Sequence, residues 1–240
     1  MAMPLSRRLL LRSTLSLGVG AAAYAAGITS PGWASEEHPT TGPTPAEALA
    51  WLKAGNSAFT KGRPAAYAFD RKRRHELAGG QHPFATVVCC SDSRVGPEQI
   101  FEAGLGQLFV IRNAGSTVAN PQAMGSVEYS VEHLGVPLVL VLGHSNCGAV
   151  KAAAEVVEKH IALPGSLGEM VAPIVPAVEF VQPRGGDLIN AAVHENVVEI
   201  VHALRSPRQP ILAQFQRKGA LRVVGGVYDL ETGVVEFIEA

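Results

Sequence analysis

Short runs of consecutive hydrophobic residues recur along the chain from residue 84 onwards. Four of them have the length of buried strands: 84–89, 108–111, 137–142 and 221–228. Segments with helical spacing of hydrophobic positions separate them, at about 97–104, 120–134, 148–160, 167–180, 186–205 and 207–218. Because strands covered on both faces are continuously apolar, the pattern predicts an α/β fold with a mostly parallel central sheet flanked by helices, in the manner of Rossmann-like folds.

Different patterns occur at the two ends of this region. The turn-like sequence at 228–233 precedes a last hydrophobic run at 234–238, which predicts a hairpin and an antiparallel C-terminal edge strand. Ahead of the sheet, hydrophobic positions between 44 and 59 are spaced for one helical face, and a second helical stretch runs from 69 to 78. We therefore expect an N-terminal helical arm.

The first 34 residues are typical of an export signal. Arg7 and Arg8 form a twin-arginine pair, an uncharged stretch rich in Ala, Gly and Leu covers 13–28, and small residues permit cleavage after Ala34. A retained membrane anchor is the alternative, but the stretch is shorter than the roughly 20 residues that span a bilayer. We expect a signal peptide at 1–34, a periplasmic or secreted protein, and a single catalytic domain at 35–240.

Composition narrows the choice of partners. Of the 240 residues, 47% are hydrophobic and 17% are charged, with a formal net charge of −1. These values suit one domain with a substantial core. A nucleic-acid-binding protein usually carries a basic excess, so we expect no nucleic-acid partner and no membrane contact after removal of the signal.

Candidate metal-binding residues follow two of the predicted strands. Cys90 follows the first strand, and His144 and Cys147 follow the third, so all three fall at carboxyl ends of strands, where open α/β sheets bind ligands. Two thiolates and one imidazole form a ligand set of catalytic zinc sites, in which the fourth position stays free. The sequence predicts one Zn²⁺ per chain, with Cu(I) as an alternative on ligand softness.

Asp92 and Arg94 add groups that a purely structural zinc site would not need. The Asp92 carboxylate could occupy the fourth position, or Arg94 could hold it aside through a charge-assisted pair, so that it orients a nucleophile. A loop-stabilising ion pair is the other interpretation. An accessible zinc lowers the pKa of its water towards about 7. Because two thiolates donate more charge than imidazoles, we expect activity to rise into the alkaline range.

These paired motifs resemble those of the β-class carbonic anhydrases. The resemblance extends from about residue 46 onward and includes Gly80-Gln81-x-Pro83-Phe84, Arg112-Asn113-Ala114-Gly115, Ser126-Val127-Glu128-Tyr129 and Tyr228-Asp229-x-x-Thr232-Gly233. It implies reversible hydration of carbon dioxide to bicarbonate and a proton by a zinc enzyme.

The resemblance also implies roles for particular residues. Cys90, His144 and Cys147 would bind zinc, and Asp92 with Arg94 would control the fourth position. The substrate pocket would be lined by Gln81, Phe109 and Tyr129. The site would lie at a subunit interface in a homodimer or homotetramer, with N-terminal helices wrapping the neighbour. One subgroup closes its site by Asp ligation and uses a Trp shortly before the first Cys; Val87 stands there, which favours the open form.

Other interpretations stay open at this point. The same scaffold could hydrolyse carbonyl sulfide or carbon disulfide, or the chain could be a non-catalytic zinc-binding module. A thiol redox protein using Cys89 and Cys90 is disfavoured, because no Cys-x-x-Cys occurs. For Cys89 we expect a small buried hydrophobe rather than an oxidation-prone thiol or an extra ligand. Nothing in the sequence selects a proton shuttle among His75, His82 and His133.

Overall fold

A computed structural model describes residues 42–63 and 70–239 of the chain. The predicted signal peptide at 1–34 and the start of the helical stretch at 69 lie outside these residues. In chain order the elements are α1 (Pro45–Thr60), α2 (Arg71–Leu77), β1 (Ala85–Cys89), α3 (Pro97–Ile100), β2 (Leu108–Arg112), η1 (Ala114–Ser116), α4 (Pro121–Glu132), β3 (Leu138–His144), α5 (Gly148–Lys159), α6 (Leu167–Val171), η2 (Ala172–Ile174), α7 (Val175–Val181), η3 (Gln182–Arg184), α8 (Leu188–Arg205), α9 (Pro210–Arg217), β4 (Arg222–Tyr228) and β5 (Val235–Ile238).

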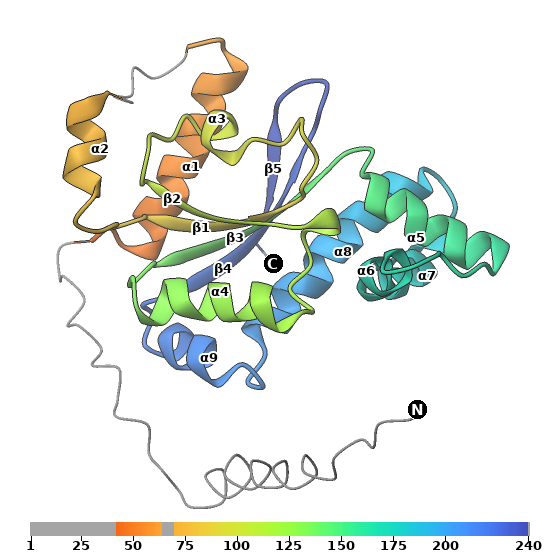
Figure 1. The fold of residues 1–240 in the computed structure, drawn as a ribbon. Coiled ribbons are helices and arrows are strands. Elements are labelled where there is room, and N and C mark those ends of the chain that lie inside the picture. Colours follow the sequence, from red (N-terminus) through yellow and green to blue (C-terminus); the bar gives the residue numbers. More distant parts are fainter. Residues whose placement is uncertain (1–41, 64–69, 240) are drawn as a thin grey trace, which may run out of the picture. The chain divides into compact units, whose positions relative to one another are not determined.

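The described residues form one five-stranded sheet with the order β2-β1-β3-β4-β5 (Figure 1). Strands β1 to β4 are parallel to their neighbours, and β5 is antiparallel to β4. The predicted α/β fold with a mostly parallel sheet and an antiparallel C-terminal edge strand is therefore confirmed. Among the helices of the described residues, none is long and apolar enough to span a membrane.

Helices cover both faces of the sheet, which explains why its strands are continuously apolar. Alternate side chains of β1, among them Val87 and Cys89, pack on one face against Leu49 and Leu52 of α1. On the other face Val88 belongs to a cluster that also includes residues of α4, α8 and α9. All five residues of β1 and all seven of β3 are buried. This central pair of strands carries the metal-ligand candidates.

Two predicted helices are shorter or more broken than their hydrophobic spacing indicates. The segment predicted at 97–104 is helical only over α3, and Glu102 adopts a left-handed conformation with φ 47° just beyond it. The segment predicted at 167–180 divides into α6, η2 and α7. Pro173 and Pro176 each stand in the first turn of a new piece, because proline lacks the backbone donor that a continuous helix needs.

The N-terminal arm differs in its packing from the expectation. A capping box between Thr44 and Glu47 starts α1, and the apolar face of α1 is buried in the core of its own chain. The buried apolar positions of α1 are therefore explained within one chain, whereas the wrapping of a neighbouring subunit stays a prediction. Helix α2 contributes no buried residue to the described structure, and Asp70 caps its start.

Candidate metal centre

Strands β1 and β3 are direct neighbours, and their register brings the two sequence motifs together. Cys89 pairs with Leu142, so Cys90 follows β1 beside the end of β3, where His144 is the last residue. Cys147 immediately precedes α5. Between them Asn146 adopts φ 56°, a left-handed conformation that asparagine tolerates and that lets the chain turn within three residues. The predicted convergence of the two loops is confirmed.

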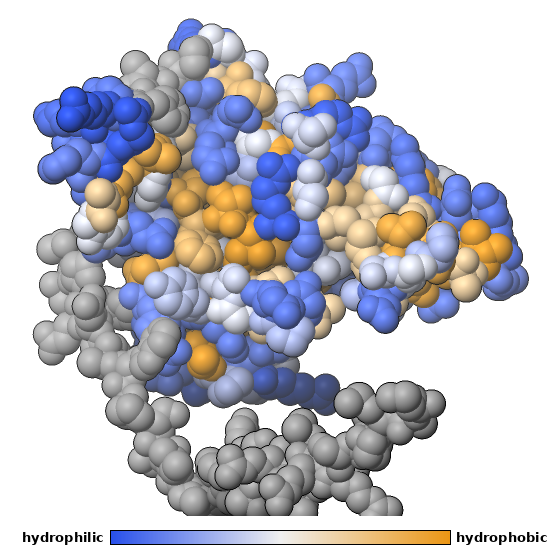
Figure 2. Space-filling view, in the orientation of Figure 1, coloured by the Kyte–Doolittle hydropathy of each residue, from blue (hydrophilic) through white to orange (hydrophobic). Residues whose placement is uncertain are grey.

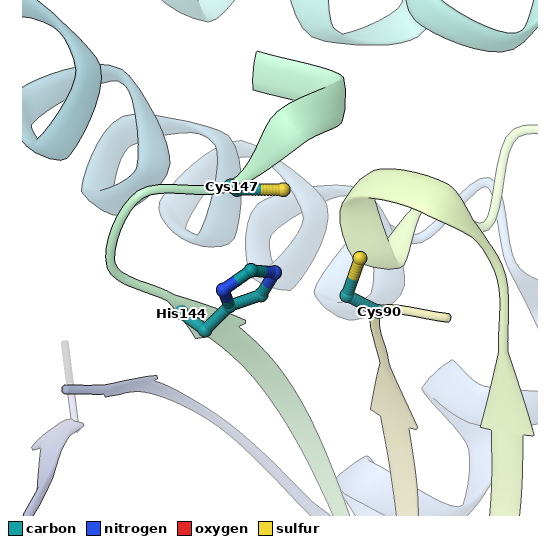
Figure 3. Close-up of side chains that lie close together, drawn as sticks. All are labelled: Cys90, His144 and Cys147. Carbon is teal, nitrogen blue, oxygen red and sulfur yellow. The ribbon is translucent and has the colours of Figure 1, made fainter. Parts of the chain in front are cut away.

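The three candidate ligands form a compact and enclosed group. The Cys90 and Cys147 sulfurs and a ring nitrogen of His144 lie within 4.8 Å of one another, and all three residues are buried. Figure 3 shows the two sulfurs and the imidazole turned toward a common point. Such a donor set matches the tetrahedral thiolate and imidazole ligation that zinc prefers.

His144 is oriented as a metal ligand. Its Nδ1 lies 2.9 Å from the carbonyl oxygen of Ser145, which fixes the ring and leaves Nε2 to face the cysteines. The Nε2 atom is buried and has no hydrogen-bond partner among the described residues. A buried ring nitrogen without a partner is costly. A cation at this point would satisfy it, so the residues present fit a metal.

The electrostatics of the two cysteine thiols also indicate that this group of residues fits a metal. A hydrogen bond from the Cys147 thiol, together with the backbone N–H groups of Gly115 and Asp92, lowers the pKa of Cys90 to about 4. The Cys90 thiolate and burial raise the pKa of Cys147. The two thiols therefore ionise in a coupled way, and Cys90 is the one that favours the thiolate form. Thiol ligands bind metals in their deprotonated form, so a divalent cation held here would have both sulfurs as thiolates.

Asp92 and Arg94 form a two-pronged ion pair beside this group. The Arg94 Nε and Nη2 donate to Asp92 Oδ1 and Oδ2 at 2.9 and 2.7 Å. The Arg94 hydrogen bond holds the pKa of Asp92 well below its usual range, so the carboxylate is ionised and acts only as an acceptor. Its Oδ2 lies 3.9 Å from His144 Nε2. Asp92 is thus placed next to the atoms that would surround the metal.

Arg112 is a site residue whose role was not predicted from the sequence. Its Nε donates to the Cys90 carbonyl oxygen at 3.0 Å, and its Nη2 donates to the Asp92 carbonyl oxygen at 2.7 Å. This guanidinium therefore fixes the backbone that carries the first ligand and the carboxylate. Its position at the end of the predicted strand 108–111 was the signal that could have revealed it.

Cys89 points away from the ligand group. Because side chains alternate along a strand, Cys89 packs on the α1 face of the sheet, whereas Cys90 belongs to the cluster beyond the strand ends. Burial raises the pKa of Cys89 to about 12. The thiol is therefore neutral and packs as a small hydrophobe, as expected from the sequence.

Gln81, Phe109 and Tyr129 do not join the ligand group within one chain. Gln81 precedes β1 at its amino end, whereas Cys90 follows its carboxyl end, and a five-residue strand spans about 16 Å. Phe109 lies in the first half of β2 and packs beside Tyr129 of α4, with ring centroids 6.3 Å apart. Two of the three aromatic and amide candidates thus meet each other but not the metal centre of their own chain.

An open α/β sheet with a buried Cys₂His ligand set at its strand ends, and an ionised carboxylate beside it, defines a metal-dependent enzyme. Comparisons with known proteins specify the family. A family model described as "Carbonic anhydrase" matches residues 85–235. The chain is 37% identical to the carbonic anhydrase of Mycolicibacterium smegmatis over 189 residues, covering 78% of this chain and 91% of that protein.

Two further comparisons agree. Carbonic anhydrase 2 of Mycobacterium tuberculosis is 36% identical over 197 residues, which cover 81% of this chain and 92% of that protein. The solved structure of the β-carbonic anhydrase CcaA superimposes with a TM-score of 0.63 at 30% identity, covering 80% of this chain and 99% of that one. The chain belongs to the β-class carbonic anhydrases, enzymes that hydrate carbon dioxide reversibly to bicarbonate and a proton.

Proposed function

We propose that Cys90, His144 and Cys147 bind one Zn²⁺ per chain and that this centre hydrates carbon dioxide to bicarbonate. The observation that carries the proposal is the buried convergence of two sulfurs and a partnerless imidazole nitrogen within 4.8 Å. When bound there, zinc supplies Lewis acidity that makes a water molecule nucleophilic near neutral pH. Three protein ligands leave a fourth position for that water.

Asp92 orients the nucleophile in this proposal. Its carboxylate is ionised and lies beside the ligand group, so it can accept a hydrogen bond but cannot donate one. Arg94 donates a hydrogen bond to each carboxylate oxygen and would so keep Asp92 from ligating the metal. Arg112 fixes the backbone of the same loop. These residues pre-organise the site before substrate arrives.

We assign the site to the open form, in which Asp92 does not ligate the metal. Ligation by Asp92 would require its two hydrogen bonds with Arg94 to break. The position that a Trp occupies in the closing subgroup is held by Val87, which is fully buried in the core between the sheet and α1. A packed aliphatic core at this point supports the absence of an anion pocket.

We infer that the enzyme is a homodimer or a higher assembly built on the β2 edge of the sheet. Strand β2 is an outer strand, and its Leu108, Phe109 and Val110 are only half-buried. Figure 2 shows hydrophobic surface gathered over this region. An apolar edge strand is a template for pairing with another chain. A second copy docked there would bring Gln81, Phe109 and Tyr129 of one protomer toward the metal centre of the other.

We further propose that residues 1–34 form a twin-arginine export signal and that the enzyme works in the periplasm or outside the cell. The Arg7-Arg8 pair and the small residues before position 35 support this proposal. Twin-arginine export carries folded proteins, so the thiolates would be metal-bound before they meet an oxidising compartment. Substituting Lys for both arginines should retain the protein in the cytoplasm, which cell fractionation measures.

Metal analysis of a matched pair of cysteine variants tests the centre. Cys147→Ser removes a proposed ligand, and Cys89→Ala changes a buried cysteine that faces the opposite side of the sheet. We expect one zinc per chain in the wild type and in Cys89→Ala, and loss of zinc and of carbon dioxide hydration in Cys147→Ser. A Cys147→Ser protein that keeps full zinc and full activity would contradict the proposed ligand set.

A further inference from the structure

Helix α8 lies against the segments that carry His144 and Cys147 and against the η1 turn, which is hydrogen-bonded to the Cys90 loop. It packs along β3 and β4 and approaches α5 at the carboxyl end of the sheet (Figure 1). Residues along its inner side contact the loop before Cys147, the end of β3 and the η1 turn.

The first contact holds the loop before Cys147. The Asn190 Oδ1 accepts a hydrogen bond from the backbone N–H of Asn146 at 3.2 Å. Asn190 is itself fixed, because its side-chain amide donates to Asp187 Oδ2 at 2.7 Å and its backbone N–H donates to Asp187 Oδ1 at 3.1 Å. Asn146 is the residue in the left-handed conformation. The start of α8 therefore stabilises the turn that separates His144 from Cys147.

The second contact sets the end of β3. A Cβ atom added to Gly143 would lie 2.7 Å from Val197 Cγ2 and 3.1 Å from Val193 Cγ1, both on α8. Only glycine permits this approach, so the strand lies directly on the helix one residue before His144. The distance between α8 and the imidazole is thus fixed by close packing.

The third contact reaches Cys90 through the η1 turn. Asn196 is 3% exposed, and its Nδ2 donates to the Gly115 carbonyl oxygen at 3.0 Å. Backbone hydrogen bonds of 3.1 Å from Ser91 to Asn113 and from Asn113 to Cys89 tie the same turn to the Cys90 loop on both sides.

A buried amide at this place is unusual in an otherwise apolar helix face. Its neighbours Val193, Val197 and Ile200 are hydrophobic, and Asn196 Oδ1 has no hydrogen-bond partner among the described residues. Burying an unpaired amide oxygen costs stability. Leucine, of nearly the same size, would remove that cost, but it would also leave the Gly115 carbonyl oxygen without this donor.

We propose that Asn196 and Asn190 are positioning residues for the metal centre, which hold the Cys90 and Cys147 segments at the separation that the metal requires. The inference rests on the proposed metal centre and deepens it. Neither residue touches the metal or the substrate in this account. Outer contacts of this kind fix the geometry of ligands, and their removal typically weakens metal affinity about 10- to 100-fold.

Zinc affinity of four variants of the full chain tests the proposal, measured by competition with a chelator. Asn196→Leu removes the amide at constant size, and Val201→Ala is its control, a buried truncation on the same helix that faces the middle of β4. Asn190→Ala removes the surface contact, and His194→Ala is its exposed control. Spectra of the cobalt-substituted proteins report ligand geometry independently of activity.

We expect both asparagine variants to lose about 10- to 100-fold in zinc affinity and to show shifted thiolate–cobalt absorption, while both controls match the wild type. Equal zinc affinity and unchanged cobalt spectra in the asparagine variants would overturn the proposal. So would an equal loss in Val201→Ala, which would assign the effect to general stability. If Asn196→Leu does not fold, the exposed Asn190→Ala decides alone. A wild type that binds no zinc would refute the metal centre itself.

Discussion

Replacing Asp92 by Asn distinguishes two interpretations of this residue, a catalytic carboxylate and a partner in an ion pair that only stabilises the loop. The two side chains have the same shape, but Asn lacks the charge that pairs with Arg94 and gains N–H donors in place of one acceptor oxygen. The Asp92 side chain is 17% exposed and its Oδ2 is 3.9 Å from His144 Nε2, so the change acts directly beside the proposed fourth metal position.

The expected losses in activity and in stability differ in size. Loss of a positioned acid–base or hydrogen-bonding group costs roughly 100- to 10,000-fold in rate, which corresponds to about 3–5 kcal/mol in the activation barrier. The stability term is small, because the Arg94 partner is 56% exposed and exposed ion pairs contribute little. We expect the Tm to fall by at most about 4 °C.

Stopped-flow carbon dioxide hydration with metal analysis of the same preparation is the assay. We expect Asp92→Asn to keep one zinc per chain and to lose at least about 100-fold in kcat/KM. Glu236→Gln is the matched control, because it neutralises an exposed carboxylate on β5. Two results would refute the reasoning: activity close to that of the wild type, which would leave only a loop ion pair, or loss of zinc, which would make Asp92 a ligand.

Three further predictions concern pH, acid stability and assembly. Because its pKa is lowered, Asp92 stays ionised throughout the assay range. The rate of hydration should therefore rise from neutral into alkaline pH as the nucleophile loses its proton. A rate that is flat from pH 7 upward would contradict this. Because folding lowers the pKa of Asp92, its ionised carboxylate contributes fully to stability above the ordinary carboxyl pKa of 3.8, and this contribution is lost as the pH falls further. Asp92→Asn lacks the contribution, so the pH at which half of the protein is unfolded by acid should rise in this variant and not in Glu236→Gln. Val110→Lys on the β2 edge should yield a monomer with reduced activity in sedimentation and rate measurements, whereas an unchanged oligomer would place the interface elsewhere.

Much of the fold was readable from the sequence because it depends on local patterns. Continuous apolar runs fixed the strands to within a residue or two, and the strand-end positions of Cys90 and His144 indicated that they converge. The register that proves their adjacency is a long-range property, which no local pattern encodes. Pro173 and Pro176 were visible breaks in the segment 167–180, and hydrophobic spacing alone did not account for them.

The surroundings of the metal centre were harder to predict. Arg112 binds the Cys90 carbonyl oxygen across 22 positions of sequence, and Asn196 binds the Gly115 carbonyl oxygen across 81 positions. Their roles therefore emerge only from tertiary packing. Gln81, Phe109 and Tyr129 were assigned by resemblance, and in one chain they lie apart from the ligand group. Their proposed function depends on a second subunit, which the sequence of one chain does not position.

The decisive measurement is carbon dioxide hydration by the zinc-loaded protein. Stopped-flow measurements on a preparation with one zinc per chain should show rapid hydration that rises with pH, and hydration should be lost when zinc is removed and regained when it is restored. Carbonyl sulfide and carbon disulfide, tested on the same preparation, identify the competing activity. A preparation with one zinc per chain that does not hydrate carbon dioxide would contradict the account.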